Sequence, residues 1–128
     1  MTREEFSEMR RQIAKTQKQT AQLLGISLKA VQSFEQGWRN IPVHIERQLL
    51  FLVALRKART QGKHPSCWDI RHCSQETRAK CPSWELQTEQ FCWLINGTIC
   101  HGEVQKNWQK KMVKCRKCEV FQTLFAGP

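Results

Sequence analysis

The cysteines of this 128-residue chain all lie in its second half, and this segregation limits the folds it can adopt. Residues 1–66 contain no cysteine, whereas the remainder contains all seven, which are Cys67, Cys73, Cys81, Cys92, Cys100, Cys115 and Cys118. A single mixed core would spread such residues along the chain. We therefore expect two small domains of different chemistry.

The expected boundary is a polar stretch in which Gly62 and Pro65 are typical of a linker. The predicted domains are residues 1–60 and 67–121, joined by a linker, 61–66, and followed by a tail, 122–128. Units of about 60 residues bury little surface, so each half is expected to need a partner or a staple.

Charge and hydropathy exclude some classes of protein. The longest apolar run, Leu49 to Leu55, is far shorter than the ~20 residues of a membrane helix. The N-terminus lacks the apolar segment of a signal peptide, so we expect a cytoplasmic protein that does not contact a membrane. Residues 1–64 carry a net charge of +7 out of the total of +10, which favours a polyanionic partner such as nucleic acid.

Helical signals follow one another through the first half. Capping patterns and apolar spacing predict helices from Thr2 to Lys15, from Thr16 to a stop at Gly25, from Leu28 to Gln36 and from Pro42 to Arg59. The second and third are short and joined by a glycine-containing turn, which is typical of a helix-turn-helix. We expect Ala21, Leu24, Val31 and Phe34 to lie in the core.

The segment from Thr16 to Pro42 resembles the lambda-repressor/Cro-like helix-turn-helix family through Ala21, Gly25, Val31 and the Glu35-Gln-Gly37 group. The resemblance covers roughly residues 5–58. It implies a DNA-binding domain of four to five helices, in which the second helix of the motif enters the major groove.

Carried over residue by residue, the resemblance implies three kinds of DNA contact. The recognition helix would contact base edges through Leu28, Lys29, Gln32 and Ser33. The preceding helix would contact phosphate or a base edge through Gln17. The loop after the recognition helix would bind phosphate through Arg39 and Asn40. The alternatives are a solvated helix face and a helix-turn-helix used for protein contacts.

The last predicted helix of the first half carries more apolar residues than one helical stripe can use. One face would close the core, and the other would pack on a second subunit or on the cysteine-rich half. Because proteins of this class bind two-fold half-sites, we expect a homodimer on double-stranded DNA.

Clustered cysteines in a cytoplasmic protein favour metal ligands over disulfides, and all seven are candidates. Cys115 and Cys118 form a Cys-x-x-Cys pair, which can grip one ion from a single turn. Four thiolates suit either a [4Fe-4S] cluster, which is slightly favoured, or zinc, and free redox thiols are the third possibility.

The pairs Cys67-Trp68 and Cys92-Trp93, together with Cys81-Pro82 and the closing Cys-x-x-Cys, resemble a cysteine-rich module called the two-CW domain. The resemblance covers residues 67–121. It implies a bacterial signalling or regulatory context but carries no established ligand.

These features predict a mainly α protein, with a helix-turn-helix bundle followed by a small irregular metal-binding domain. The expected function is sequence-specific transcription regulation, with the cysteine-rich domain sensing redox state or metal, or contacting an unknown protein partner. One alternative is a structural zinc module used for protein contacts. A thiol enzyme built on Cys100 and His101 is the other, and we do not expect an enzyme because no Gly-rich loop or carboxylate pair accompanies them.

Overall fold

The computed structural model describes residues 1–61 and 65–125, and for Thr60 and Gln61 it describes the backbone alone. The described chain is mainly helical, as expected, with one small two-stranded sheet. It divides into two compact units, which we call unit 1 (Met1–Arg56) and unit 2 (Lys57–Pro128). The division falls a few residues before the boundary expected at residue 60.

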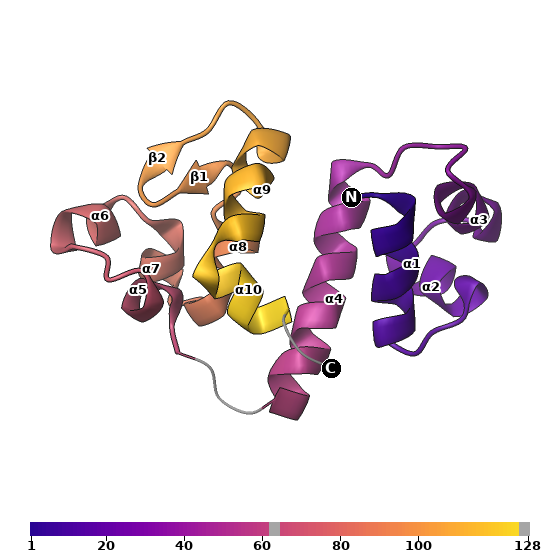
Figure 1. Cartoon of the computed structure of the whole chain (residues 1–128), viewed down its shortest axis with the longest axis horizontal. Coiled ribbons are helices and arrows are strands. Elements are labelled where there is room, and N and C mark those ends of the chain that lie inside the picture. Colours follow the sequence, from indigo (N-terminus) through magenta and orange to yellow (C-terminus); the bar gives the residue numbers. More distant parts are fainter. Residues whose placement is uncertain (62–64, 126–128) are drawn as a thin grey trace. The chain divides into compact units, whose positions relative to one another are not determined.

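Four helices occupy the first 61 residues, where four to five were expected (Figure 1). They are α1 (Arg3–Gln12), α2 (Gln17–Leu24), α3 (Leu28–Gln36) and α4 (Val43–Gln61). The first is shorter at both ends than expected, and the last runs two residues further. Of the expected linker, residues 62–64 lie outside the described chain.

Local signals fix where α2 and α3 begin and end. Thr16 and Gln19 form a capping box at the start of α2, and the Ser27 side chain accepts a hydrogen bond from the Ala30 backbone N–H at the start of α3. Gly25 ends α2 with φ of +68°, a left-handed conformation that costs glycine little. The short turn between the two helices is thus specified by its own sequence.

The core of unit 1 forms around two aromatic rings. Phe6 and Phe34 pack edge to face with ring centroids 5.7 Å apart, and they are 0% and 2% exposed. The four residues expected in this core are all buried, and the apolar side chains that complete it are Ile13, Ala30, Ile45, Leu49, Leu50, Val53 and Ala54.

Unit 2 is built from short helices and one hairpin rather than from irregular chain (Figure 1). Its elements are α5 (Cys67–Ile70), α6 (Gln75–Ala79), α7 (Pro82–Leu86), the 3-10 helix η1 (Glu89–Phe91), α8 (Cys92–Ile95), β1 (Ile99–Cys100), β2 (Glu103–Val104), α9 (Trp108–Lys117) and α10 (Glu119–Phe125). The expected tail 122–128 is corrected in part, because residues 122–125 form the end of α10 and Leu124 is buried there. Residues 126–128 lie outside the described chain.

The hairpin of unit 2 is tight. Strands β1 and β2 are antiparallel, with Ile99 opposite Val104 and Cys100 opposite Glu103. The two residues between the strands, His101 and Gly102, have φ of +51° and +81°, as a two-residue turn with both central residues left-handed requires. This turn brings Cys100 and His101 to the end of the hairpin.

Aromatic side chains fill the core of unit 2. Trp93 is 1% exposed, and its ring centroid lies 5.7 Å from that of Phe121 and 5.4 Å from that of Phe125. A polar network lies alongside, in which the buried Ser83 donates its backbone N–H to Asn96 Oδ1 at 2.9 Å. Aromatic packing and a few buried hydrogen bonds therefore hold these short elements together.

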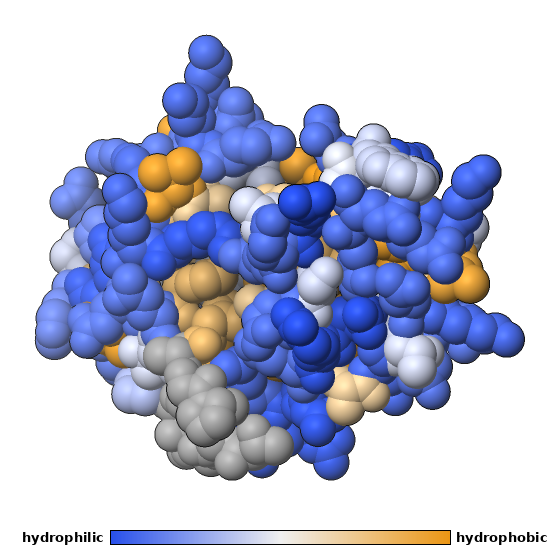
Figure 2. Space-filling model, turned by 45° about the vertical axis from the view of Figure 1, so that its right-hand side comes forward, coloured by the Kyte–Doolittle hydropathy of each residue, from blue (hydrophilic) through white to orange (hydrophobic). Residues whose placement is uncertain are grey.

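Hydrophilic side chains cover most of the face drawn in Figure 2, and apolar residues show there as small patches. Among the described residues, none of the helices is both long and apolar enough to cross a membrane.

Candidate functional site

One face of α3 presents most of the side chains expected to read DNA. Leu28 is 40% exposed, and Lys29 and Gln32 are also exposed. These residues are spaced one, three and four positions apart, so the helical repeat places them together on one side of α3. Unit 1 thus offers a polar face on the helix that follows the Gly25 turn.

Ser33 does not belong to this face. It is 8% exposed, and its backbone carbonyl accepts hydrogen bonds from the N–H groups of Trp38 at 2.9 Å and Arg39 at 3.4 Å. Helical geometry turns it by one residue, about 100°, from Gln32 toward the core. The base contact expected of Ser33 stays a prediction, made for a side chain that is buried in this structure.

The loop after α3 is exposed where phosphate contacts were expected. Arg39 and Asn40 are both exposed, and the Arg39 guanidinium lies over the Phe34 ring at 5.6 Å from its centroid. The neighbouring Trp38 is 79% exposed. No periodic pattern in the sequence singles out Trp38.

Gln17, the expected contact from the preceding helix, already has a protein partner. Its side-chain amide donates to the Glu35 carboxylate, which also forms an ion pair with Arg10 at 2.5 Å. Arg10 and Glu35 are both largely buried, with side chains 20% and 10% exposed. These bonds fix Gln17 at the start of α2 and hold it against α3.

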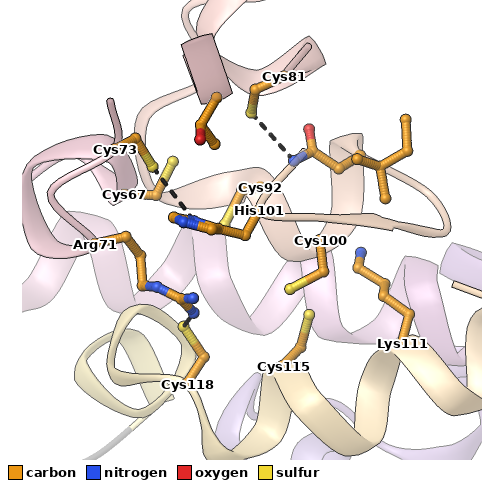
Figure 3. Close-up of a pocket in the computed structure, with 13 residues that line it drawn as sticks. Cys67, Arg71, Cys73, Cys81, Cys92, Cys100, His101, Lys111, Cys115 and Cys118 are labelled. Atoms are coloured by element: carbon orange, nitrogen blue, oxygen red, sulfur yellow. Dashed lines mark hydrogen bonds between the residues drawn. The ribbon is translucent and has the colours of Figure 1, made fainter. Parts of the chain in front are cut away.

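A second candidate site is a cavity in unit 2 that all seven cysteines line (Figure 3). Its volume is about 50 Å³, room for a few water-sized groups, since one water needs roughly 10–15 Å³. The remaining lining residues are Arg71, Thr77, Asn96, Ile99, His101 and Lys111. We call this the cysteine cavity.

The cysteines reach the cavity from many separate segments. Cys67 begins α5, Cys92 begins α8, Cys100 ends β1 and Cys115 lies in the last turns of α9. The three others flank the helices, Cys73 after α5, Cys81 before α7 and Cys118 after α9. A ligand held here would therefore tie together most elements of unit 2.

Four of the thiols face polar side chains, and one of these contacts is between Cys67 Sγ and Ser83 Oγ at 3.5 Å. The Arg71 guanidinium donates to Cys118 Sγ at 3.1 Å, and the Asn96 amide donates to Cys81 Sγ at 3.4 Å (Figure 3). Cys73 Sγ lies 3.7 Å from His101 Nδ1.

Two pairs of thiols also influence each other, and Cys67, which contacts Ser83, belongs to one of them. The Cys92 thiol donates to Cys67, which lowers the pKa of Cys67 to about 7 and raises that of Cys92. In the same way the Cys115 thiol lowers the pKa of Cys100 to about 6, and its own pKa rises. Each pair therefore holds one thiol that ionises readily near neutral pH.

Positive charge accompanies these thiols. Lys111 is 1% exposed, and its ammonium group donates to the Trp93 carbonyl and lies 4.8 Å from the centroid of the Trp108 ring. The pKa of Arg71 is raised by its hydrogen bond to Cys118 and by the thiols of Cys100 and Cys73. The cavity is thus suited to sulfur in its anionic form.

The metal prediction and the enzyme alternative can both be compared with the positions of these side chains. Within residues 1–61 and 65–125, no three His, Cys, Asp or Glu side chains converge closely enough to hold one metal ion, so the described arrangement does not test the metal prediction. The enzyme alternative paired His101 with Cys100, but the His101 ring instead faces Cys73.

Sequence reasoning singled out His101 but missed the other polar residues of the cavity. Lys111 could have been found, because the spacing of Trp108, Lys111, Met112 and Cys115 places all four on one helical face, where a lysine is unusual. Arg71 and Asn96 carry no such signal, since each acts on a cysteine that is distant in sequence.

Comparison with protein-family models, with curated protein sequences and with solved structures gives no match to this chain.

Proposed function

We propose that this chain is a DNA-binding transcription regulator whose unit 1 reads DNA and whose unit 2 holds a metal centre. The observation that carries the first part is the exposed polar face of α3, directly after the tight turn at Gly25. The observation that carries the second is that all seven cysteines line one cavity.

The side chains of α3 match the chemistry of base edges. Lys29 suits the acceptors of guanine, Gln32 suits adenine, and the half-exposed Leu28 suits a thymine methyl group. Arg39 and Asn40 follow in the exposed loop and suit phosphate. Since α3 is only one short helix, we propose that two copies of the chain bind a two-fold site as a dimer.

Gln17 takes a different role in this proposal from the one implied by the family resemblance. Its amide is bonded to Glu35, so it fixes the start of α2 against α3 rather than standing free for a base.

The residues of the cysteine cavity fit a thiolate-bound metal. Thiolates are the protein ligands shared by zinc and iron–sulfur centres, and buried or hydrogen-bonded cations beside them favour their ionised form. A bound metal would supply cross-links among the short elements and, if it is a cluster, the capacity to gain or lose an electron. Such a group gives unit 2 a means of sensing redox state or metal.

DNA binding is tested by selecting sites from a random duplex pool with the full chain, then measuring affinity by fluorescence anisotropy at several salt concentrations. Binding should weaken steeply as salt rises, because released counterions drive it. Lys29→Ala and Gln32→Ala should each weaken the selected site by about 1–3 kcal/mol and leave random duplex nearly unaffected.

Lys106→Ala is the matched control, because it removes the same charge from an exposed position in unit 2. It should leave the affinity for the selected site within a factor of about two. Equal losses for Lys29→Ala and Lys106→Ala, or no binding even at low salt, would contradict the proposed DNA-reading face.

A further inference from the structure

Helix α9 of unit 2 concentrates positive charge. Between Trp108 and Lys117 it carries five Lys or Arg residues and no Asp or Glu. The rest of residues 65–125 carries four Lys or Arg against six Asp or Glu, a net charge of −2. The positive charge in the second half of the chain therefore comes from this one helix.

Three of these basic residues lie on one exposed face of α9. Lys110, Lys114 and Lys117 are all exposed. At about 100° per residue they fall within about 60° of one another around the helix, and a rise of about 1.5 Å per residue spreads them along about 10 Å of its axis. We call these three residues the α9 lysine stripe.

A different side of α9 holds the helix in unit 2. Trp108, Met112 and Cys115 are buried there, and in Figure 3 Lys111 and Cys115 point from α9 into the cysteine cavity. The Asn107 side chain accepts a backbone hydrogen bond from the first turn and caps the helix. The core and the cap thus position α9, and the ammonium groups of the stripe are not needed for this.

Without a partner, the α9 lysine stripe is electrostatically unfavourable. Lys110 lies in the first turn, near the positive end of the helix dipole, and the four-residue spacing of Lys110 and Lys114 makes their like charges repel. Within residues 1–61 and 65–125, no stripe lysine forms an ion pair with a carboxylate. A surface that serves only solubility normally mixes charges of both signs. This single-sign face instead indicates a polyanionic partner.

Duplex DNA is the polyanion that suits the stripe best. It carries one negative charge per about 1.7 Å of its axis, so the roughly 10 Å of the stripe matches about six phosphates. An anionic membrane also attracts lysines, but a helix that lies on a membrane needs an apolar face in contact with lipid. The large apolar residues of α9, Trp108 and Met112, are buried in unit 2, and only Val113 is apolar and exposed on this helix.

We propose that the α9 lysine stripe is a second DNA contact of this chain, which binds the phosphate backbone of a duplex without reading its sequence. The choice of DNA among polyanions rests on the proposed function of unit 1, and the stripe itself requires no metal in unit 2. Phosphate contacts add affinity and salt dependence but carry no sequence information directly. The stripe therefore strengthens binding to every duplex by the same factor.

The test compares variants of the full chain by fluorescence anisotropy on the selected site and on random duplex, each at several salt concentrations. The double variant Lys110→Gln/Lys114→Gln should bind both duplexes about tenfold more weakly at low salt, and the slope of log affinity against log salt should become shallower by about two. Lys110→Arg/Lys114→Arg keeps both charges and should bind like the wild type.

Lys80→Gln/Lys106→Gln is the matched control, because it removes two exposed charges of unit 2 outside α9. Its affinity for both duplexes should stay within a factor of about two of the wild type. Circular dichroism should give the same helix content for all three double variants, since every replaced side chain is exposed.

Several outcomes would overturn the stripe. One is wild-type affinity and salt slope in Lys110→Gln/Lys114→Gln, and if Lys29→Ala still loses the selected site, the proposed function of unit 1 stands. Equal losses in the stripe variant and in Lys80→Gln/Lys106→Gln, or a loss confined to the selected site, would also contradict it. So would stripe-dependent binding that is tighter to phosphatidylserine vesicles or to polyglutamate than to duplex at the same salt.

Failure of the proposed function gives a different result. Stripe-dependent binding to random duplex by a chain that selects no site supports the second DNA contact and overturns the DNA-reading face of unit 1. A wild type that binds no duplex even at low salt overturns both.

Discussion

Units 1 and 2 are of similar size but are specified in different ways. In unit 1, caps and glycine turns define α2 and α3 locally, and Phe6 and Phe34 meet in an apolar core. In unit 2 most helices have four or five residues, too few to be stable by themselves, and distant side chains hold them in place. The comparison shows that helices can be determined by local sequence signals, as in unit 1, or by long-range contacts, which in unit 2 include those of the cysteines.

The largest expected difference between the units follows from removing thiols. Replacing both Cys115 and Cys118 by Ser should abolish metal retention, because this Cys-x-x-Cys pair lines the cysteine cavity and is the pair expected to hold the metal. A structural metal contributes on the order of 10 kcal/mol to folding. Limited proteolysis with mass spectrometry should then find new cleavages in residues 67–121 and none in α1–α4 of unit 1.

The Cys73→Ser/Cys81→Ser double variant is the matched control for that experiment, since it also replaces two cavity thiols. It should keep its metal and its resistance to protease. Cleavage of both units at equal rates in the Cys115/Cys118 variant would remove the distinction drawn between them.

Unit 1 should instead lose stability when a side chain of its apolar core is truncated. Phe34→Ala removes a ring that is 2% exposed and contacts Phe6, so it should lower the free energy of unfolding by about 3–5 kcal/mol. Urea denaturation of the full chain followed by circular dichroism should show the early loss of α1–α3, and the metal content of the folded protein should not change.

Trp38→Ala provides the comparison for Phe34→Ala, because Trp38 is a larger aromatic residue that is 79% exposed. Its effect on stability should be about 0.5 kcal/mol or less. If the two variants cost the same, the core described for unit 1 does not govern its stability.

A smaller effect is expected at the turn between α2 and α3. Gly25 has φ of +68°, and a Cβ added there would meet no atom within 4 Å, so Gly25→Ala should cost only the backbone strain of about 1–2 kcal/mol. Gly25→Asn should cost less, because asparagine tolerates the left-handed region better. Urea midpoints of the two variants measure this difference, and equal midpoints would show that backbone strain does not limit the turn.

The sequence predicts the structure of unit 1 better than that of unit 2. The Thr16–Gln19 capping box and the glycine at residue 25 act within a few residues, so spacing alone locates the helices of unit 1. A family pattern names positions such as Ser33 as base contacts, but it does not report that the angle around α3 leaves this side chain only 8% exposed.

In unit 2 the sequence indicated which residue type matters but not its arrangement. The Cys-x-x-Cys motif suggested that Cys115 and Cys118 act together, yet Cys115 faces Cys100 and Cys118 faces Arg71. Such partners are far apart in the chain, and neither helical nor strand periodicity reports on them. The helical end of the expected tail was missed as well, because α10 gains its place by burying Val120, Phe121 and Leu124.

The central claim is that unit 2 depends on a bound metal and unit 1 does not. Hydrogen exchange of the full chain, measured by mass spectrometry before and after the metal is removed without oxygen, tests it most directly. The account predicts that amide protection collapses across α5–α10 and stays unchanged in α1–α3. Unchanged protection in both units, or its loss in both together, would contradict it.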